Sequence, residues 1–429
     1  MKHMSRFLAA SLVLLCSAPS RAQDLSISEA MKFALEHSPT LNSVRQEVRK
    51  AKGSKVQADG NFFPRISING SYSDGRYPSV GNNGWRTDSR SASVGLSQNL
   101  YAGGKHAAQR RLAKEQLSQA ELTVREAEED LAVRLNTLFY SVLLARETVA
   151  AAKDAVETSQ KHVQEVRQML KLGLANQLEV IRAEQQLSSN EASLASSQGT
   201  LDSARINLLN LMGLPPSSEY SPVGTLDSAR PAGTSPASIE LARKQRADKA
   251  ILEKQIAMQK EQIKIAQSGM KPSVDFSASA AVDNPYHNQD RTDDSWKATL
   301  SLEIPVYDRG QTRGEVMKAR AVQEQNKYKL RQKELDILSE IDLAWVEIND
   351  SEAQVTARRK AHALAKETLR LSQVGYREGV TPQLDLLEAQ SNLTSARKDY
   401  SQSLFNHLMR IVALKRAEGA LIPWTLEGR

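Results

Sequence analysis

Apolar residues recur along this chain with two different periods, and the longer period predicts helices. Between residues 135 and 170 they lie alternately three and four positions apart, which is the heptad pattern of a coiled coil. The positions of this seam are Leu135, Leu138, Val142, Ala145, Val149, Ala152, Val156, Ser159, Val163, Val166 and Leu170. No Pro or Gly interrupts residues 105–172 or 315–374. At a rise of about 1.5 Å per residue, each stretch predicts a helix on the order of 100 Å long.

The chain also repeats itself at a constant offset of 206 residues. The segment "LGLANQLEVIRAEQQL" at 172–187 corresponds to "EGVTPQLDLLEAQSNL" at 378–393. Apolar residues seven positions apart follow the glycine of each segment, Gly173 or Gly379, and indicate a returning helix. Each half of the chain is therefore predicted to contain a long helical hairpin, with its tip near residue 173 or 379.

The shorter period is two, and it predicts β-strands. Apolar and polar residues alternate in "RISINGSYS", "SASVGLSQNLY", "SVDFSASAAV" and "KATLSLEIPV", which form two expected β-hairpins, 62–101 and 272–307. Strands of about ten residues with one apolar face suit a membrane-spanning barrel, apolar toward lipid and polar toward a lumen. Aromatic residues cluster near the strand ends, as interfacial side chains do in membranes: Tyr72, Tyr77, Trp85, Tyr101, Tyr286, Trp296 and Tyr307. Amphipathic hairpins on a soluble core are the alternative interpretation.

The number of strands has a consequence for assembly. Four strands are too few to close a barrel, since single-chain barrels start at about eight. Open sheet edges are not tolerated in lipid. If these strands span a membrane, several protomers must share one barrel, so the membrane hypothesis requires an oligomer.

The first 22 residues have the features of a secretory signal peptide. Basic residues near the start precede the short apolar run "LAASLVLLC", and small residues precede an expected cleavage site after Ala22. The only cysteine, Cys16, lies in this segment, so cleavage would leave neither a disulfide nor a thiol nucleophile.

Two structural repeats are expected after this segment. The first occupies residues 23–212 and the second residues 237–429, each with a helix, a β-hairpin and a long helical hairpin. The stretch 213–236 between them is rich in Pro, Gly and Ser and is expected to be irregular.

Charge and motifs argue against several function classes. The formal net charge of +7 is mild and no basic block occurs, so nucleic acid is not an expected partner. The histidines are not paired at ligand spacing, and no Gly-x-Ser-x-Gly motif occurs. We therefore expect no enzyme activity, no cofactor and no metal site.

A carboxylate pair in "TPQLDLLEAQ" is the most notable candidate for a functional site. Asp385 and Glu388 are candidates for a catalytic acid and base, half of a metal site, a helix cap or part of a charged ring. A catalytic pair would need a walled, water-poor pocket, which a leucine-rich coiled-coil tip does not suggest. Asp385 also lies in the first turn of a predicted helix, where a negative charge meets the positive end of the dipole.

With these elements in place, the chain resembles the TolC family of outer-membrane efflux and secretion channels. The resemblance covers the two repeats, the strand exit "NLYAGG" and the second tip, "YREGVTPQLDLLEAQSNLTSARKDY". It implies an α+β membrane protein, a homotrimer with a shared twelve-stranded β-barrel in outer-membrane lipid on a long α-helical coiled-coil barrel. It also implies a passive duct that docks on an inner-membrane pump, proton-driven or ATP-driven, through a periplasmic membrane-fusion adaptor.

The resemblance also assigns roles to residues at the tips. Family members carry acidic rings where the tunnel narrows, and Asp385 and Glu388 match those positions. Tyr376 matches a tyrosine that bonds across the gate, and Glu179 is the repeat mate of Asp385. Thr381 stands where the best-known family member has an arginine that holds the gate closed. The expected adaptor contacts are Gly173, Leu174, Leu178, Gly379, Val380 and Leu384.

The sequence supports a passive exit duct for multidrug efflux or type I secretion, with an acidic tip ring that gates the duct and selects for cations. A soluble periplasmic coiled-coil adaptor or scaffold is the alternative. An adaptor would carry a Gly-rich β-module between two helical arms, and a scaffold has no use for two matched strand hairpins. The sequence does not identify the cargo.

Overall fold

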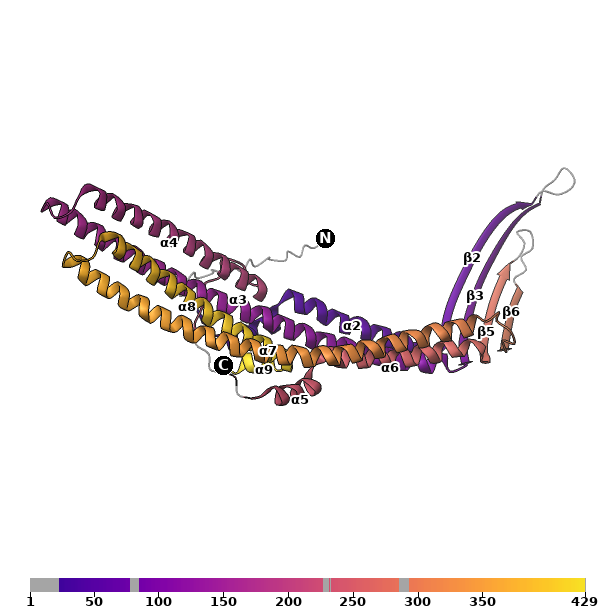
Figure 1. Cartoon of the computed structure of the whole chain (residues 1–429). Coiled ribbons are helices and arrows are strands. Elements are labelled where there is room, and N and C mark those ends of the chain that lie inside the picture. Colours follow the sequence, from indigo (N-terminus) through magenta and orange to yellow (C-terminus); the bar gives the residue numbers. More distant parts are fainter. Residues whose placement is uncertain (1–22, 78–84, 227–230, 232, 285–292, 429) are drawn as a thin grey trace, which may run out of the picture.

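The protein is elongated, with long helices over most of its length and a small β-sheet at one end (Figure 1). A computed structural model describes residues 23–77, 85–226, 231, 233–284 and 293–428. The expected signal peptide with Cys16 lies outside the described residues, as do Tyr286 and the side chains of Tyr77 and Trp85.

The elements follow each other in two similar series. The first series is β1 (Gln23–Leu25), α1 (Ile27–His37), α2 (Pro39–Gly60), β2 (Arg65–Tyr77), β3 (Trp85–Ala102), α3 (Lys105–Lys171) and α4 (Gln177–Met212). The second is β4 (Tyr220–Pro222), α5 (Ser235–Gln245), α6 (Ala247–Gln267), the short 3-10 helix Ser268–Met270, β5 (Ser273–Asn284), β6 (Asp293–Glu303), α7 (Gln311–Arg377), α8 (Gln383–Glu418) and α9 (Leu421–Leu426). Two helices precede each strand pair, where the sequence predicted one.

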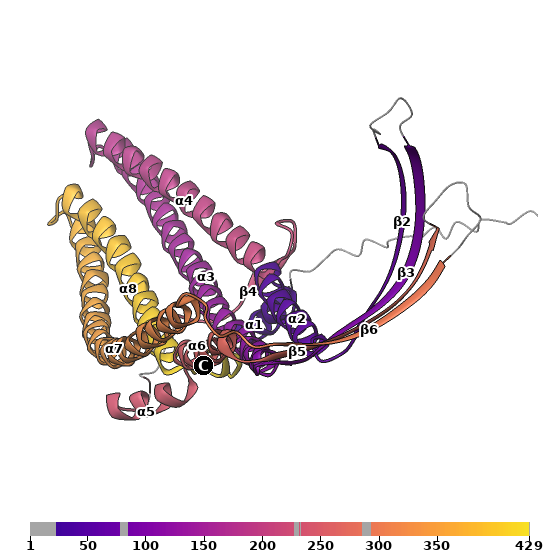
Figure 2. The same ribbon diagram turned by 90° about the vertical axis from the view of Figure 1, so that its right-hand side faces the viewer.

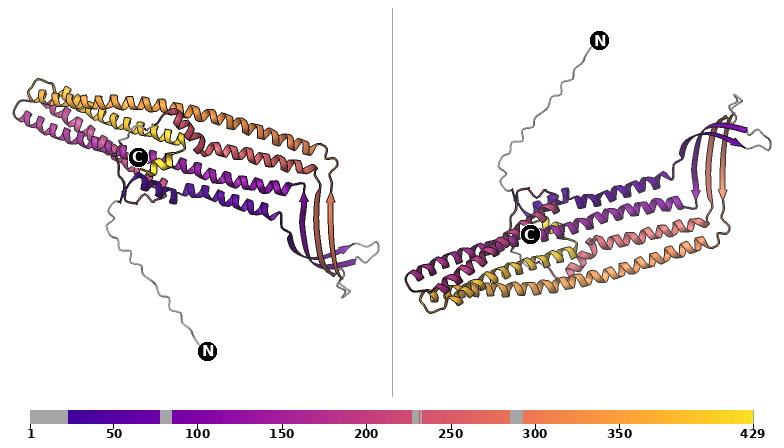
Figure 3. Two further views of the ribbon diagram at one scale, coloured as in Figure 1. Left: turned by 90° about the horizontal axis from the view of Figure 1, so that it is seen from below. Right: turned by 90° about the horizontal axis from the view of Figure 1, so that it is seen from above.

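Helices α3 and α7 run from the sheet to the opposite end of the molecule, and each has 67 residues. Helices α4 and α8, with 36 residues each, return alongside them, so that the two hairpin tips lie at the same end (Figure 1). Figure 2 shows α3–α4 and α7–α8 as two separate pairs, with the four strands curving away together on the other side. Toward the sheet, α2, α3, α6 and α7 lie next to one another (Figure 3).

Burial along α3 follows the heptad pattern. Most seam positions are buried, among them Leu135, Val149 and Val166, and Leu138 and Leu170 are partly buried. None of the described helices combines the length and the apolar character that a membrane crossing requires.

The sheet is antiparallel in the order β2-β3-β5-β6, so β2 and β6 are its edges. Register places Ile68, Val94, Ala280 and Trp296 in one row on its apolar face. Serines occupy the other face, where the hydroxyls of Ser71 and Ser91 lie 2.7 Å apart. The strands have 13, 18, 12 and 11 residues, longer than the expected ten. β3 is the longest because it pairs with β2 over residues 85–97 and with β5 over residues 90–102, where the register shifts between Asn99 and Tyr101.

The largest core lies midway along the molecule. There α1, α9 and the parallel pair β1–β4 pack on α3, around buried Met31, Leu135 and Phe139. A smaller core at the first tip joins α3 to α4 through Val163, Val166, Val180 and Ala183. The first tip therefore depends on a thin local core, while the largest core lies in the middle of the molecule.

Candidate functional site

The two hairpin tips turn on glycines in the left-handed conformation. Gly173 and Gly379 both have φ near 73°, a value that favours glycine because a Cβ would be strained there. Each tip is closed by main-chain hydrogen bonds: Leu174 donates to Met169 O at 2.9 Å, and Val380 donates to Gly375 O at 2.8 Å. Both glycines are exposed, so the turns themselves face solvent in the protomer.

The helices that leave the two tips begin differently. Asn176 caps α4, with its Oδ1 accepting from the Glu179 main-chain N–H at 3.0 Å while the Glu179 carboxylate accepts from the Asn176 N–H at 3.3 Å. Pro382 occupies the cap of α8 and supplies no side-chain hydrogen bond. The carboxylate of Glu179 therefore has a local structural role, which its repeat mate Asp385 does not share.

Asp385 and Glu388 are both exposed near the start of α8. The residues between and after them, Leu386, Leu387 and Ala389, are buried against the hairpin. The two carboxylates therefore lie on the solvent face of the tip helix, where an approaching ion or a second protomer would meet them.

Thr381 folds back on the end of α7. Its main-chain N–H donates to Gly375 O at 3.0 Å, and its hydroxyl lies where a Cβ on Gly375 would be. The side chain of Thr381 therefore packs against Gly375 within its own hairpin turn.

Tyr376 lies between the two hairpins. Its ring meets the ring of His162 from α3 edge-on, with the centroids 5.5 Å apart. Burial raises the pKa of the Tyr376 hydroxyl, and the nearby charges of Glu179 and Glu165 raise it further. Glu165 also pairs with Arg377 at 3.5 Å, so the end of α7 is bound to α3 by both an aromatic and an ionic contact.

Both tips carry large apolar side chains that are exposed to solvent. The large exposed side chains there are Leu172, Leu174, Leu178, Val380 and Leu384, with exposures from 52% to 80%. Such a concentration of exposed apolar side chains marks an interaction surface.

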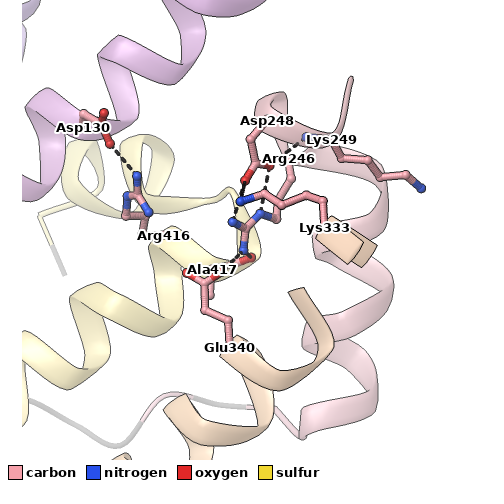
Figure 4. Close-up of polar contacts among 8 residues, drawn as sticks. All are labelled: Asp130, Arg246, Asp248, Lys249, Lys333, Glu340, Arg416 and Ala417. Atoms are coloured by element: carbon pink, nitrogen blue, oxygen red, sulfur yellow. Dashed lines mark hydrogen bonds and ion pairs between the residues drawn. The ribbon is translucent and has the colours of Figure 1, made fainter. Parts of the chain in front are cut away.

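A second polar cluster lies midway along the molecule, at the break between α5 and α6 (Figure 4). Buried Arg246 donates to both carboxylate oxygens of Asp248, at 3.1 and 2.7 Å. It also donates to Glu340 of α7 at 2.5 Å and to the carbonyl of Ala417 of α8 at 3.3 Å. Lys333 of α7 adds a contact to Asp248 at 2.8 Å. One guanidinium therefore joins α6, α7 and α8.

One carboxyl of this cluster, Asp248, and one beside it, Glu129 of α3, have shifted pKa values. Burial opposes ionisation of Asp248, but hydrogen bonds from Arg246 and Lys333 hold its pKa below its usual range. Burial raises the pKa of Glu129 to about 7, although the charges of Arg125 and Arg416 act in the other direction. Glu129 Oε2 is buried without a hydrogen-bond partner among the described residues.

Sequence reasoning missed two buried residues at the tip, His162 and Gln383, and the packing of Thr381 on Gly375. Gln383 could have been noticed, because it lies two positions before Asp385 of the acidic pair. Its burial had no signal, since its repeat mate Gln177 is exposed. The described residues hold no cluster of three or more candidate metal ligands.

Comparison with known proteins gives the family. The profile of the family described as "Outer membrane efflux protein" matches residues 30–214 and 238–420. The outer membrane protein TolC of Escherichia coli K12 is 22% identical over 392 residues, covering 87% of this chain and 78% of that protein. Protein CyaE of Bordetella pertussis is 24% identical over 431 residues, covering 96% and 88%.

Solved structures agree on the fold. CusC, whose structures concern transmembrane channel formation, superposes with a TM-score of 0.78 at 20% identity, over 92% of both chains. The open state of the MtrE outer membrane channel of Neisseria gonorrhoeae gives 0.76 at 19% identity, over 94% of this chain and 93% of that one. The family match covers both repeats, and the family is one of transport proteins, not of enzymes. The chain therefore belongs to the outer membrane efflux protein family, and it is an outer-membrane exit duct with a periplasmic extension.

Proposed function

We propose that three copies of the chain assemble around one axis and share a twelve-stranded barrel. The observation that carries this proposal is the open sheet, with an exposed apolar face, a serine-lined face and two unpaired edges, β2 and β6. Unpaired backbone groups at such edges are costly in lipid, so they require closure by neighbouring copies. Three sheets of four strands give an even-numbered barrel within the observed range.

Exposed side chains on the apolar face of the sheet support a barrel in which this face is turned toward lipid. Ile68 is 80% exposed and Trp296 is 82% exposed, although both are large and apolar. Tyr72 and Tyr101 mark positions toward opposite ends of the face, as aromatic girdles do at the two membrane interfaces. The serine face would then line the lumen.

The tip is the proposed gate and selectivity filter of this duct. Threefold assembly would bring Asp385 and Glu388 from each copy toward the axis as two acidic rings. Such rings attract cations and exclude anions, because each carboxylate adds to one negative potential in a narrow passage. The duct itself is passive, and the energy for transport comes from a pump in the inner membrane.

The apolar tip surface is the proposed docking site for a periplasmic membrane-fusion adaptor. Leu174 and Leu178 on the first tip, with Val380 and Leu384 on the second, present exposed apolar side chains next to Gly173 and Gly379. An adaptor that covers them would connect the duct to a proton-driven or ATP-driven pump. Relatives named for protease secretion support type I secretion as one use of the duct, and efflux as in the family description is the other.

A soluble periplasmic adaptor or scaffold is the disfavoured alternative. It leaves the apolar face of the sheet without a function, and the family match points to outer-membrane channels.

The assembly is tested by fractionating cell envelopes and measuring the mass of the purified protein with and without heating. We expect the protein in the outer-membrane fraction, at three times the chain mass before heating and at the chain mass afterwards. A monomer in the soluble fraction would contradict the proposal.

A further inference from the structure

A buried glutamine and a buried histidine join the two helical hairpins at the tip. His162 of α3 is 3% exposed and Gln383 at the start of α8 is 5% exposed. Gln383 Nε2 lies 2.8 Å from the main-chain oxygen of Glu179 in α4 and 3.3 Å from His162 Nε2. One amide group of the second hairpin therefore contacts both helices of the first.

Hydrogen-bond chemistry fixes the protonation state of this contact. The Glu179 carbonyl only accepts, so the Gln383 atom that faces it must be the NH₂ group. Exchanging the amide oxygen and nitrogen would bring two acceptors to 2.8 Å. The same NH₂ faces His162 Nε2, which must then accept, so His162 is neutral with its proton on Nδ1.

Gln383 has no alternative arrangement that would accommodate a charged His162. Its Oε1 is buried without a partner among the described residues, so it already lacks one hydrogen bond. Protonation of His162 would place an N–H donor against the NH₂ donor at 3.3 Å. Rotating the amide to avoid this would break the bond to Glu179. The contact therefore holds only while His162 is neutral.

Charged and titratable groups reach His162 from all the surrounding helices. Glu165 lies on α3 and Glu179 on α4, while Tyr376 and Arg377 lie on α7, where Arg377 is paired with Glu165. On α8 the nearest charged residue in sequence is the exposed Asp385. Burial lowers the pKa of His162, and this outweighs the two glutamates, which raise it.

We propose that His162 and Gln383 form a latch that holds the two hairpins together at the closed tip, and that protonation of His162 releases it. The proposal rests on the proposed role of the tip as the gate of the duct. Thr381 stands where the best-known family member has an arginine that holds the gate closed. In this chain, the His162–Gln383 contact within one protomer would hold the tip closed instead.

The direction of the pH effect follows from linkage. In the open tip, His162 is solvated and has an ordinary pKa of about 6.5, while in the closed tip its pKa is lower. The open tip therefore binds the proton more readily. The latch therefore stabilises the closed tip fully when the pH is above the ordinary histidine pKa. This stabilisation is lost as the pH falls below that pKa.

Spin labels on the two tips measure the latch without requiring transport. Leu174→Cys and Val380→Cys introduce exposed labelling sites, one on each hairpin, and the only other cysteine of the sequence, Cys16, lies in the expected signal peptide. Double electron–electron resonance then gives the distance between the tips in the full-length protein in detergent. We expect the open-to-closed ratio to rise between about pH 7.5 and about pH 5, by a factor of up to about 30, because a solvated histidine with a pKa of about 6.5 is protonated about 30 to 1 at pH 5.

Three variants separate the latch from general effects of acid. His162→Gln is neutral at both pH values and should give a pH-independent distance. Gln383→Leu removes the donor and should give an open tip at both. His407→Gln is the matched control, since His407 is 5% exposed and its Nδ1 bonds Ser351 Oγ at 2.8 Å within the second hairpin alone. This control should keep the pH response, and circular dichroism would confirm that each variant is folded.

The outcomes distinguish the latch from the duct. A tip distance that does not respond to pH in the parent protein, or a response that persists in His162→Gln, overturns the latch. Planar-bilayer recordings of the same protein test the duct separately. If the protein forms channels but its tip distance does not depend on pH, the latch alone is refuted. If the tip distance depends on pH but the protein forms no channels, the duct alone is refuted.

Discussion

Replacing Arg246 by alanine tests whether the cluster midway along the molecule holds its helices together. The Arg246 side chain is 6% exposed, Asp248 is 19% exposed and Glu340 is 40% exposed. Removing one partner of a buried, hydrogen-bonded ion pair costs about 3–5 kcal/mol, because the other charge stays buried. In the variant, Asp248 keeps its contact with Lys333 at 2.8 Å, and Glu340 can turn to solvent. We therefore expect Arg246→Ala to lower the free energy of unfolding by a smaller amount, about 2–4 kcal/mol.

Urea unfolding in detergent measures this loss through tryptophan fluorescence, to which Trp345, 8% exposed on α7, contributes along with the other three tryptophans of the chain. Arg243→Ala is the matched control, because Arg243 forms an ion pair with Glu240 whose side chains are 55% and 61% exposed. The control should leave the midpoint unchanged, since exposed pairs contribute little. Equal midpoints for Arg246→Ala and Arg243→Ala would refute the role of the cluster.

Three further changes test other parts of the structure. The pKa of Glu129 is raised to about 7, so its ionisation opposes folding as the pH rises. Glu129→Gln should raise the urea midpoint at about pH 8, and the gain should shrink as the pH falls and vanish below about pH 4, where the carboxyl is protonated in the unfolded chain as well. Gly375→Ala places a methyl group against the Thr381 hydroxyl and should destabilise the second tip in hydrogen exchange, and adding Thr381→Ala should restore protection. Ile68→Arg should reduce insertion into liposomes by about 2–4 kcal/mol, whereas Asn69→Arg on the serine face should insert normally. An unchanged midpoint at pH 8 would contradict the argument about Glu129. A tip that stays unprotected in the double variant would contradict the argument about Gly375. Equal insertion of the two arginine variants would contradict the assignment of the two faces of the sheet.

Much of the fold could be predicted because its elements are long and strongly periodic. The heptad seam of α3 repeats many times without Pro or Gly, and Gly173 and Gly379 mark the turns where only glycine is unstrained. The strand pattern was equally clear, because a sheet with one apolar and one serine-lined face requires strict alternation along each strand. The division of the helical stretch before each strand pair into two helices was not predicted, and neither was the short helix α9, since short patterns are hard to distinguish from a loop.

The candidate site was less predictable because it depends on contacts between the hairpins. His162 and Gln383 are 221 positions apart, and no periodicity relates them. The repeat also misleads at the tips, because Asn176 caps the first helix where Pro382 stands in the second. Equivalent positions such as Glu179 and Asp385 therefore have different surroundings, and only the packing shows this.

Ion selectivity in planar bilayers tests most directly whether copies of this chain form one duct with an acidic tip. Reversal potentials under a salt gradient would compare the parent protein with the double variant Asp385→Asn and Glu388→Gln. We predict a cation-selective channel that trivalent cations block, and a strong loss of both properties in the variant, because the rings would lose their charge. A parent protein without channels, or equal selectivity in the two proteins, would contradict the account.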